Sequence, residues 1–246
     1  WLAAWAEGST LKLQHVDETG SNVVMAKSEN IGGTISHTTL ATDGSTYVTV
    51  ATQQIPTGDS VIAYRHDKQL TKQGTLIKVD SASPSKTVEG VSAAIKGSTA
   101  WLVYSFEKAG GGHIIKAAAV NLSNGNVSTS PFRVSKSGQT LPKAGLPEIA
   151  IVGGTPTVVW WEKVAGELRG AWLGSGSVSK RFHIALGMNN QLHSTSGEPL
   201  SIVESNGNAS IVFPDYTMSG NAALKYVSVG AGQTGSVMGA KALTGT

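Results

Sequence analysis

The sequence contains no cysteine. Disulfide bonds, thiol catalysis and cysteine-based metal sites are therefore excluded. Charged residues are also scarce, since they make up 14% of the chain, against roughly a quarter of an average soluble protein. Glycine, serine, threonine and asparagine take their place, and this composition is typical of a chain with many tight turns.

Long apolar runs and basic clusters are absent as well. No stretch approaches the roughly 18 consecutive apolar residues of a membrane-spanning helix, so we expect no membrane span. The 19 Lys and Arg residues are scattered and give a formal net charge of only +3. A nucleic-acid-binding surface needs a concentrated basic face with aromatic side chains for stacking, so we expect no nucleic-acid partner. The chain begins at Trp1 without an initiator Met or a signal peptide, which predicts an internal or processed piece.

What the chain does contain is a repeat. Five short segments rich in β-branched and aromatic residues recur along it, and four of them end in a carboxylate: WLAAWAE, YVTVATQ, WLVYSFE, PTVVWWE and ASIVFPD. A strand-like segment and a glycine-containing turn precede four of the five, and two more strand-like segments follow each one. No segment shows sustained helical periodicity.

Four antiparallel strands in each repeated unit predict an all-β fold, a β-propeller of four-stranded blades. The five units span about residues 1–30, 31–84, 85–138, 139–190 and 191–246, and form one propeller domain or part of one. A two-sheet sandwich is the rival fold, but it does not explain the repeat.

The first unit begins at what is the second strand of the others. We therefore expect it to lack its innermost strand, and its edge to be covered by a neighbouring segment or by another chain, because an unpaired edge promotes aggregation.

The adjacent Trp160 and Trp161 test this fold. Neighbouring side chains on a strand point to opposite faces, so one indole is exposed for binding or both faces of the strand are buried. Every blade of a propeller lies between two others, and we therefore expect both indoles to be buried.

The fourth unit, VVWWEKVAGELRGAWLGSGSVSKRFHIA, resembles the propeller repeats of bacterial secreted and surface proteins, and AAVNLSNGNVSTSPFRVS repeats its ending. These repeats are loosely similar to those of bacterial neuraminidases. The resemblance implies an architecture and an extracellular or cell-surface location, but no activity, because the sialidase Asp-box Ser-x-Asp-x-Gly-x-Thr-Trp is absent.

Two groups of polar residues are candidates for ligand binding on the loop-bearing face. The first is the column of polar residues that end the second strands, from which Glu107, Glu162 and Asp215 are selected together with Tyr216. The second is the connection LGMNNQLHSTSGEP, with Asn189, Asn190 and His193. Alternatively, the acids bind backbone N–H groups or neighbouring lysines, and the connection is an ordinary solvated loop.

Catalytic and metal signatures are weak. The four Arg residues fall on third and outer strands rather than at the propeller axis, and the histidines lack metal-ligand spacing. We expect no cofactor, although a turn such as VDETG could accept Ca²⁺.

These patterns favour a non-enzymatic recognition or adhesion propeller that binds glycan or protein through its loop face. One alternative is a structural domain of a bacterial or phage surface appendage. The other is a hydrolase of the sialidase or glycosidase type whose catalytic residues lie outside this chain.

Overall fold

The structure is a computed structural model. It describes residues 1–84, 86–108, 112–136, 146–162, 167–184, 200–216, 222–237 and 239–242. Within these ranges the side chains of residues 22–24, 162, 167, 215, 216, 222 and 236 are outside the description. The described residues contain no helix, and so none that is long and apolar enough to cross a membrane.

The strands form five sheets in chain order. Sheet one contains β1 (Leu2–Glu7), β2 (Thr10–Val16) and β3 (Asn22–Asn30). Sheet two contains β4 (Thr34–Thr42), β5 (Tyr47–Gln54), β6 (Ser60–His66) and β7 (Ile77–Ser81). Sheet three contains β8 (Val88–Lys96), β9 (Thr99–Glu107), β10 (His113–Asn121) and β11 (Val127–Arg133). Sheet four contains β12 (Glu148–Val152), β13 (Thr155–Glu162), β14 (Glu167–Leu173) and β15 (Val178–Ile184), joined by β19 (Gly235–Val237). Sheet five contains β16 (Ser201–Ser205), β17 (Asn208–Tyr216), β18 (Ala222–Gly230) and β20 (Lys241–Ala242).

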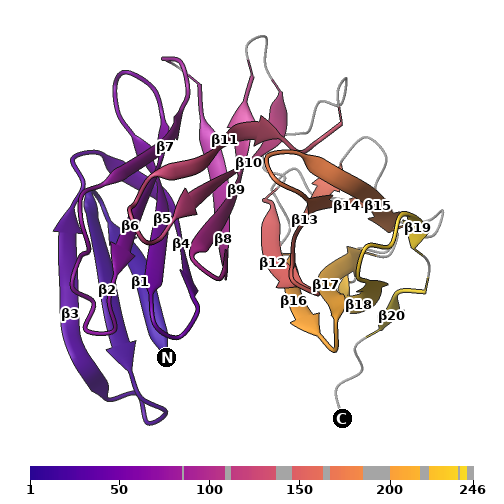
Figure 1. The fold of residues 1–246 in the computed structure, drawn as a ribbon, viewed down its shortest axis with the longest axis horizontal. Helices are drawn as coiled ribbons and strands as arrows, with labels where there is room; N and C mark the ends of the chain where they lie inside the picture. Colours follow the sequence, from indigo (N-terminus) through magenta and orange to yellow (C-terminus); the bar gives the residue numbers. More distant parts are fainter. Residues whose placement is uncertain are drawn as a thin grey trace.

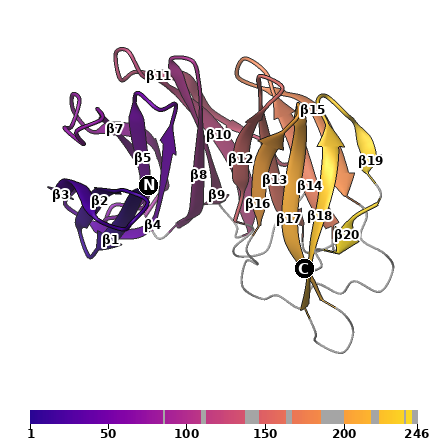
Figure 2. The ribbon, with the colours of Figure 1, turned by 90° about the horizontal axis from the view of Figure 1, so that it is seen from below.

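The sheets are arranged as the blades of a β-propeller. Consecutive strands within each blade pair antiparallel. The strand that begins each sheet packs against the one that begins the next sheet: β1 against β4, β4 against β8, β8 against β12 and β12 against β16. Figure 1 shows the blades fanned around a common centre, and Figure 2 shows them side by side from the indigo first blade to the yellow fifth. The predicted propeller is therefore confirmed.

The first blade lacks an innermost strand. Among the described strands, β1 pairs only with β2, whereas in each other blade the equivalent strand pairs on both sides. The arc of blades is open between β1 and β16 in Figure 1. The expected missing strand is confirmed within the described residues, and its covering segment stays a prediction.

Both tryptophans of the fourth blade are buried. Trp160 is 1% exposed and Trp161 is 5% exposed. Trp160 belongs to the apolar cluster shared with the third blade, while Trp161 belongs to the cluster shared with the fifth blade and meets the ring of Phe213 edge-on, with 5.9 Å between centroids. The two-sided burial predicted from the strand period is confirmed.

The hairpin turns between first and second strands use glycine as predicted. Gly44, Gly97 and Gly207 have φ values of 86°, 54° and 77°. Asn206 precedes Gly207 with a φ of 51°, so both central residues of that turn are left-handed, as a two-residue hairpin with a primed turn requires. These turns lie on the rim opposite the ends of the second strands; we call the latter rim the loop face.

A segment of the fifth blade extends the fourth. β19 pairs parallel with β15, with Phe182 opposite Gly235. Just before it, the carbonyl of Gln233 accepts a hydrogen bond from Nε1 of the buried Trp172 at 2.8 Å. The fourth and fifth blades are thus joined by backbone pairing as well as by their apolar cores.

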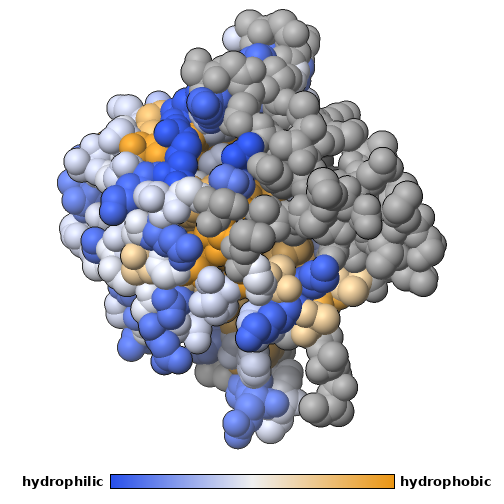
Figure 3. Space-filling view, turned by 90° about the vertical axis from the view of Figure 1, so that its right-hand side faces the viewer, coloured by the Kyte–Doolittle hydropathy of each residue, from blue (hydrophilic) through white to orange (hydrophobic). Residues whose placement is uncertain are grey.

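On the side of the molecule shown in Figure 3, the described surface is mainly hydrophilic, and apolar surface is confined to small areas.

Replacing Gly170 by Ala should destabilise the protein by about 1–3 kcal/mol, because a side chain added there would overpack the core. A Cβ at Gly170 would lie 2.0 Å from the ring of Phe182. Urea denaturation of Gly170→Ala measures the loss. The matched control is Gly174→Ala in the same blade, whose Cβ would meet nothing closer than 3.8 Å, and it should stay within about 0.5 kcal/mol. Equal stabilities of the two variants would show that the Phe182 ring moves aside without a loss in the free energy of unfolding.

Candidate active site

Of the candidate ligand-binding residues selected from the sequence, Glu107 is the one whose side-chain surroundings the structure describes. At the end of β9, its carboxylate accepts hydrogen bonds from the backbone N–H and the hydroxyl of Thr87, at 3.1 and 3.2 Å, and pairs with Lys86 Nζ at 3.2 Å. The N–H of Thr87, together with Lys86, holds the pKa of Glu107 below its usual value. Glu107 thus fixes the segment that leads into β8, which is the alternative considered from the sequence.

Other members of the column make similar local contacts. Glu7 pairs with Lys12 at 2.5 Å and accepts a hydrogen bond from Trp5 Nε1 at 3.1 Å. Gln53 donates to the carbonyl of Ile31. The polar ends of these second strands therefore bind neighbouring strands and loops.

The other selected residues cannot be placed by their side chains. Glu162 ends β13, and Asp215 and Tyr216 end β17, but their side chains are outside the description. Asn189, Asn190 and His193 lie outside the described residues. Ligand binding by this set stays a prediction.

A carboxylate that sequence analysis did not select lies on the innermost strand of the fourth blade. Glu148 is the first residue of β12 and is half-buried. Its Oε2 accepts a hydrogen bond at 2.7 Å from the hydroxyl of Ser92 on β8, the innermost strand of the third blade. The same hydroxyl accepts a hydrogen bond from the N–H of Ile149 at 3.3 Å. Ser92 therefore fixes Glu148 at the junction of two innermost strands.

The electrostatic environment of Glu148 differs from that of Glu107. Burial raises the pKa of the Glu148 carboxyl, and the hydrogen bond from Ser92 offsets part of this rise. A carboxyl with a raised pKa keeps its proton to higher pH, which is the property that a general acid needs. Within the blades, Glu148 is therefore suited to donate a proton and Glu107 to remain ionised.

Two more titratable groups occupy the innermost strands near the loop face. Glu89 lies on β8 opposite Ser105, and His37 lies on β4 opposite Thr52. Burial lowers the pKa of His37, and the charge of Glu89 opposes that shift. Both strands contain an irregularity at this position, since the register shifts on either side of residue 36 in β4 and of Gly90 in β8. Bulges of this kind redirect side chains and are frequent beside active sites.

The sequence did contain a signal for these residues. Each lies near the beginning of an apolar first-strand segment: SHTTLA for His37, VEGVSAAI for Glu89 and PEIAIV for Glu148. Three successive innermost strands thus each have one titratable residue near the loop face. The bulges in β4 and β8 shift two of these residues from equivalent positions in the repeat.

The described residues include no set of three or more His, Asp or Glu side chains placed to hold a metal ion. In the turn that was considered for Ca²⁺, Oδ1 of Asp17 accepts hydrogen bonds from Thr19 N–H and Ser21 N–H, at 2.8 and 3.0 Å. The expectation of no cofactor, with Ca²⁺ at this turn as the alternative, stays a prediction.

The raised pKa of Glu148 predicts how stability depends on pH. The folded state binds the Glu148 proton more tightly than the unfolded chain does, so this contribution is complete below the unfolded pKa and is lost as pH rises through the folded pKa. The wild type should therefore lose stability relative to Glu148→Gln as pH rises above the ordinary pKa of a glutamate, about 4.3. Urea denaturation at a series of pH values measures the difference.

Glu107→Gln is the matched control with the opposite sign. Because the folded pKa of Glu107 is lowered, its contribution is present above the unfolded pKa and is lost as pH falls. The wild type should gain stability relative to Glu107→Gln as pH rises. The same sign for both variants would contradict the assigned environments.

No family model matches the chain, and no curated protein matches it in sequence. Several solved structures share its fold. An α-L-arabinanase from Penicillium chrysogenum, complexed with arabinobiose, aligns with a TM-score of 0.61 at 12% identity, over 92% of this chain and 71% of its own. An α-L-arabinofuranosidase from Fusarium graminearum aligns with a TM-score of 0.54 at 12% identity, over 95% and 72%. TolB from Acinetobacter baumannii aligns with a TM-score of 0.52 at 13% identity, over 100% and 53%.

These likenesses correct two expectations from the sequence. A non-enzymatic recognition or adhesion module was the wrong prediction, and so was the prediction that the protein is not an enzyme, because the similar folds include an arabinanase and an arabinofuranosidase. Sequence analysis selected the column at the ends of the second strands, whereas Glu148 lies on an innermost strand outside that column. At these identities the likeness establishes the β-propeller fold, to which the chain conforms over nearly its whole length.

Proposed function

We propose that the protein is a glycoside hydrolase in which Glu148 donates the proton to the leaving-group oxygen. The observation that carries this proposal is a carboxyl with a raised pKa, fixed by Ser92 at the loop-face end of an innermost strand. A glycoside hydrolase needs one carboxylic acid that retains its proton and a second carboxylate that remains ionised.

Glu89 is the second carboxylate in this proposal. It lies near the beginning of β8, and β8 packs directly against β12. Its charge acts on His37 of β4, the innermost strand of the second blade, where it opposes the lowering of the His37 pKa. In the reaction, Glu89 would activate a water molecule or attack the anomeric carbon, while Glu148 protonates the departing oxygen.

The substrate class follows from the similar enzymes. They are an arabinanase complexed with arabinobiose and an arabinofuranosidase complexed with an iminosugar inhibitor. We therefore propose a neutral, arabinose-containing glycan as the substrate of the inner-strand site. An extracellular or cell-surface location, where such polymers occur, remains part of this proposal.

Hydrolysis of a panel of aryl glycosides tests the function. The panel contains α-L-arabinofuranosides, β-xylosides and β-galactosides, each compared with buffer alone. Release of phenol from the arabinofuranoside, abolished by the double variant Glu89→Gln/Glu148→Gln, is expected. Equal release by the wild type and the double variant would overturn the assignment of the two carboxylates, and no release from any member would overturn the proposed activity on these substrates.

A further inference from the structure

A second site lies between the third and fourth blades, away from the innermost strands. It is a cavity of about 80 Å³, whereas pockets for whole drug-sized ligands have roughly 300–1,000 Å³. It can hold a few water molecules or one small polar group. The lining residues come from the segment that follows β11 and from β13 to β15: Lys136, Trp160, Arg169, Gly170, Arg181, Phe182 and His183.

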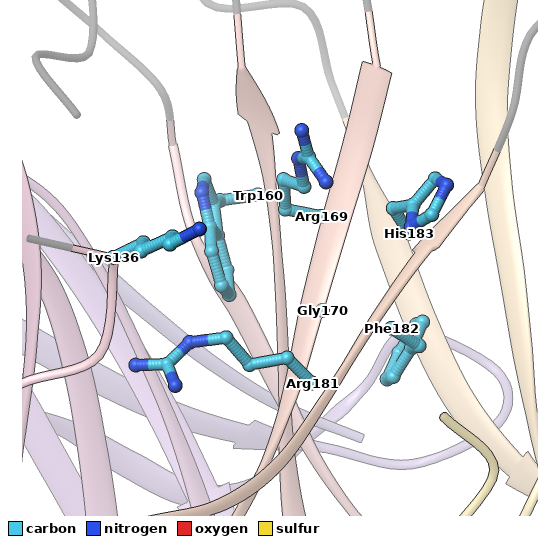
Figure 4. A pocket seen from close by; sticks show the side chains of 7 residues that line it. All are labelled: Lys136, Trp160, Arg169, Gly170, Arg181, Phe182 and His183. Carbon is cyan, nitrogen blue, oxygen red and sulfur yellow. The ribbon is translucent and has the colours of Figure 1, made fainter. Parts of the chain in front are cut away.

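The strand register brings the side chains of Trp160, Arg169, Arg181 and His183 to one face, whereas Phe182 belongs to the apolar cluster on the other face. Trp160 is opposite Arg169, and Arg169 is opposite His183. Arg181 lies opposite Ala171, one pleat further from the loop face. Opposed residues of an antiparallel pair point to the same side of the sheet, here the side packed against the third blade. Lys136 reaches the cavity from that neighbouring blade, and Figure 4 shows its side chain extending toward Trp160.

The indole nitrogen of Trp160 lacks an acceptor. Trp160 is 1% exposed, and its Nε1 is buried without a hydrogen-bond partner among the described residues. Indole N–H groups are donors only, and a buried donor that is left unpaired destabilises the folded state. Because Trp160 lines the cavity, an acceptor bound there would satisfy it.

The other polar groups of the cavity are also suited to an acceptor. Lysine and arginine side chains offer donors and no acceptors. Arg181 donates a hydrogen bond from Nη2 to the carbonyl of Val134 at 3.1 Å. This bond orients the guanidinium, which has further N–H groups that can donate to a bound anion. In Figure 4, the guanidinium of Arg169 lies near the upper end of the Trp160 indole, and Arg181 lies below the indole. The described lining includes no carboxylate side chain.

We propose that this cavity binds a compact oxyanion, such as the carboxylate of a uronic acid or a sulfate group. Three cationic side chains and the Trp160 indole, whose buried N–H has no partner among the described residues, line a space of the size of such a group. Charge-assisted hydrogen bonds from arginine to an oxyanion are among the strongest in proteins. Glu148 is not among the described lining residues of this cavity, and anion binding there does not require glycoside hydrolysis.

The indole N–H resonance of Trp160 reports directly on the site. In ¹⁵N–¹H spectra of the full chain, that resonance is assigned by its loss in Trp160→Phe. Titration with sodium galacturonate or sodium sulfate, at ionic strength held constant with sodium chloride, should shift it saturably downfield as it gains an acceptor. Galactose, which lacks the carboxylate, should leave it in place. No saturable shift with either anion, or an equal shift with galactose, overturns the proposal.

Charge-removing variants identify the cavity as the binding place. Lys136→Gln, at an exposed residue that folding tolerates, and Arg181→Gln should each weaken binding at least about tenfold. Lys180→Gln is the matched control, because Lys180 is on the same strand and contacts the carbonyl of Gly232 rather than the cavity. Equal weakening by Lys180→Gln and Lys136→Gln would reduce the effect to general charge attraction and overturn the site. Galacturonate binding more tightly than sulfate would identify a sugar-borne carboxylate as the ligand, and equal affinities would identify a site for oxyanions in general.

Discussion

Replacing Glu148 by Gln is expected to lower kcat for glycoside hydrolysis by about 10²- to 10⁴-fold, the usual contribution of a general acid. Glutamine retains an oxygen that can accept the hydrogen bond from Ser92, so the local structure should persist while the transferable proton is lost. The loss should be large for leaving groups that require protonation and small for nitrophenolate, which leaves as an anion. Steady-state kinetics on a methyl glycoside and on a nitrophenyl glycoside measure this contrast.

The pH profile gives a second measure of the same role. Because the proposed mechanism requires protonated Glu148, kcat of the wild type is expected to fall as pH rises through the raised pKa of this group. That alkaline limb should be absent from Glu148→Gln. Glu107→Gln serves as the control, since Glu107 is bound by Lys86 and Thr87, and it should retain most activity. If Glu148→Gln cleaves the methyl glycoside at the wild-type rate, Glu148 is not the proton donor.

The repeat in the sequence was sufficient to predict the fold. Second strands recur with apolar residues on both faces, and only an architecture in which each sheet lies between two others accommodates Trp160 and Trp161 on one strand. The positive φ values at Gly44, Gly97 and Gly207 follow from the same periodic turns. These properties depend on local strand period and turn chemistry, which a sequence expresses directly.

The candidate active site was not predictable in the same way. The column of second-strand ends that includes Glu107 was conspicuous because a polar residue repeats at one position of each unit, yet this repetition reflects the shared architecture. Glu89 and His37 are displaced from strict alignment by the bulges in β8 and β4. The raised pKa of Glu148 depends on burial and on Ser92 from a different blade. Contacts between blades decide these properties, and such contacts are not expressed in the order of residues within one unit.

The cationic cavity illustrates the same limit. The sequence correctly places Arg169 on a third strand and Arg181 on an outer strand, which suggested that the arginines are dispersed. Pairing of β14 with β15 brings both to one face, and packing of the neighbouring blade adds Lys136. Only the register of the strands and the blade-to-blade contact make a site of these residues.

Truncating Trp161 to Ala should destabilise the protein by about 3–5 kcal/mol, the usual cost of removing a large buried aromatic side chain. Trp161 belongs to the core between the fourth and fifth blades, where its indole meets Phe213. Chemical denaturation followed by circular dichroism measures the loss. Leu224→Ala is the control in the fifth blade, because Leu224 is 51% exposed, and it should change stability by about 0.5 kcal/mol at most.

Coupling between the two interfaces gives the sharper form of this prediction. In a double-mutant cycle, Trp161→Ala and Phe213→Ala should show a coupling of about 0.5–1.5 kcal/mol, as aromatic pairs in contact do. Trp160→Ala is equally severe in volume but lies on the face packed against the third blade, so its coupling to Phe213→Ala should be close to zero. The pair of cycles separates two-sided burial from burial of a single face. Equal coupling of Trp160 and Trp161 to Phe213 would mean that the two indoles share one core, which a strand between two neighbouring blades does not allow.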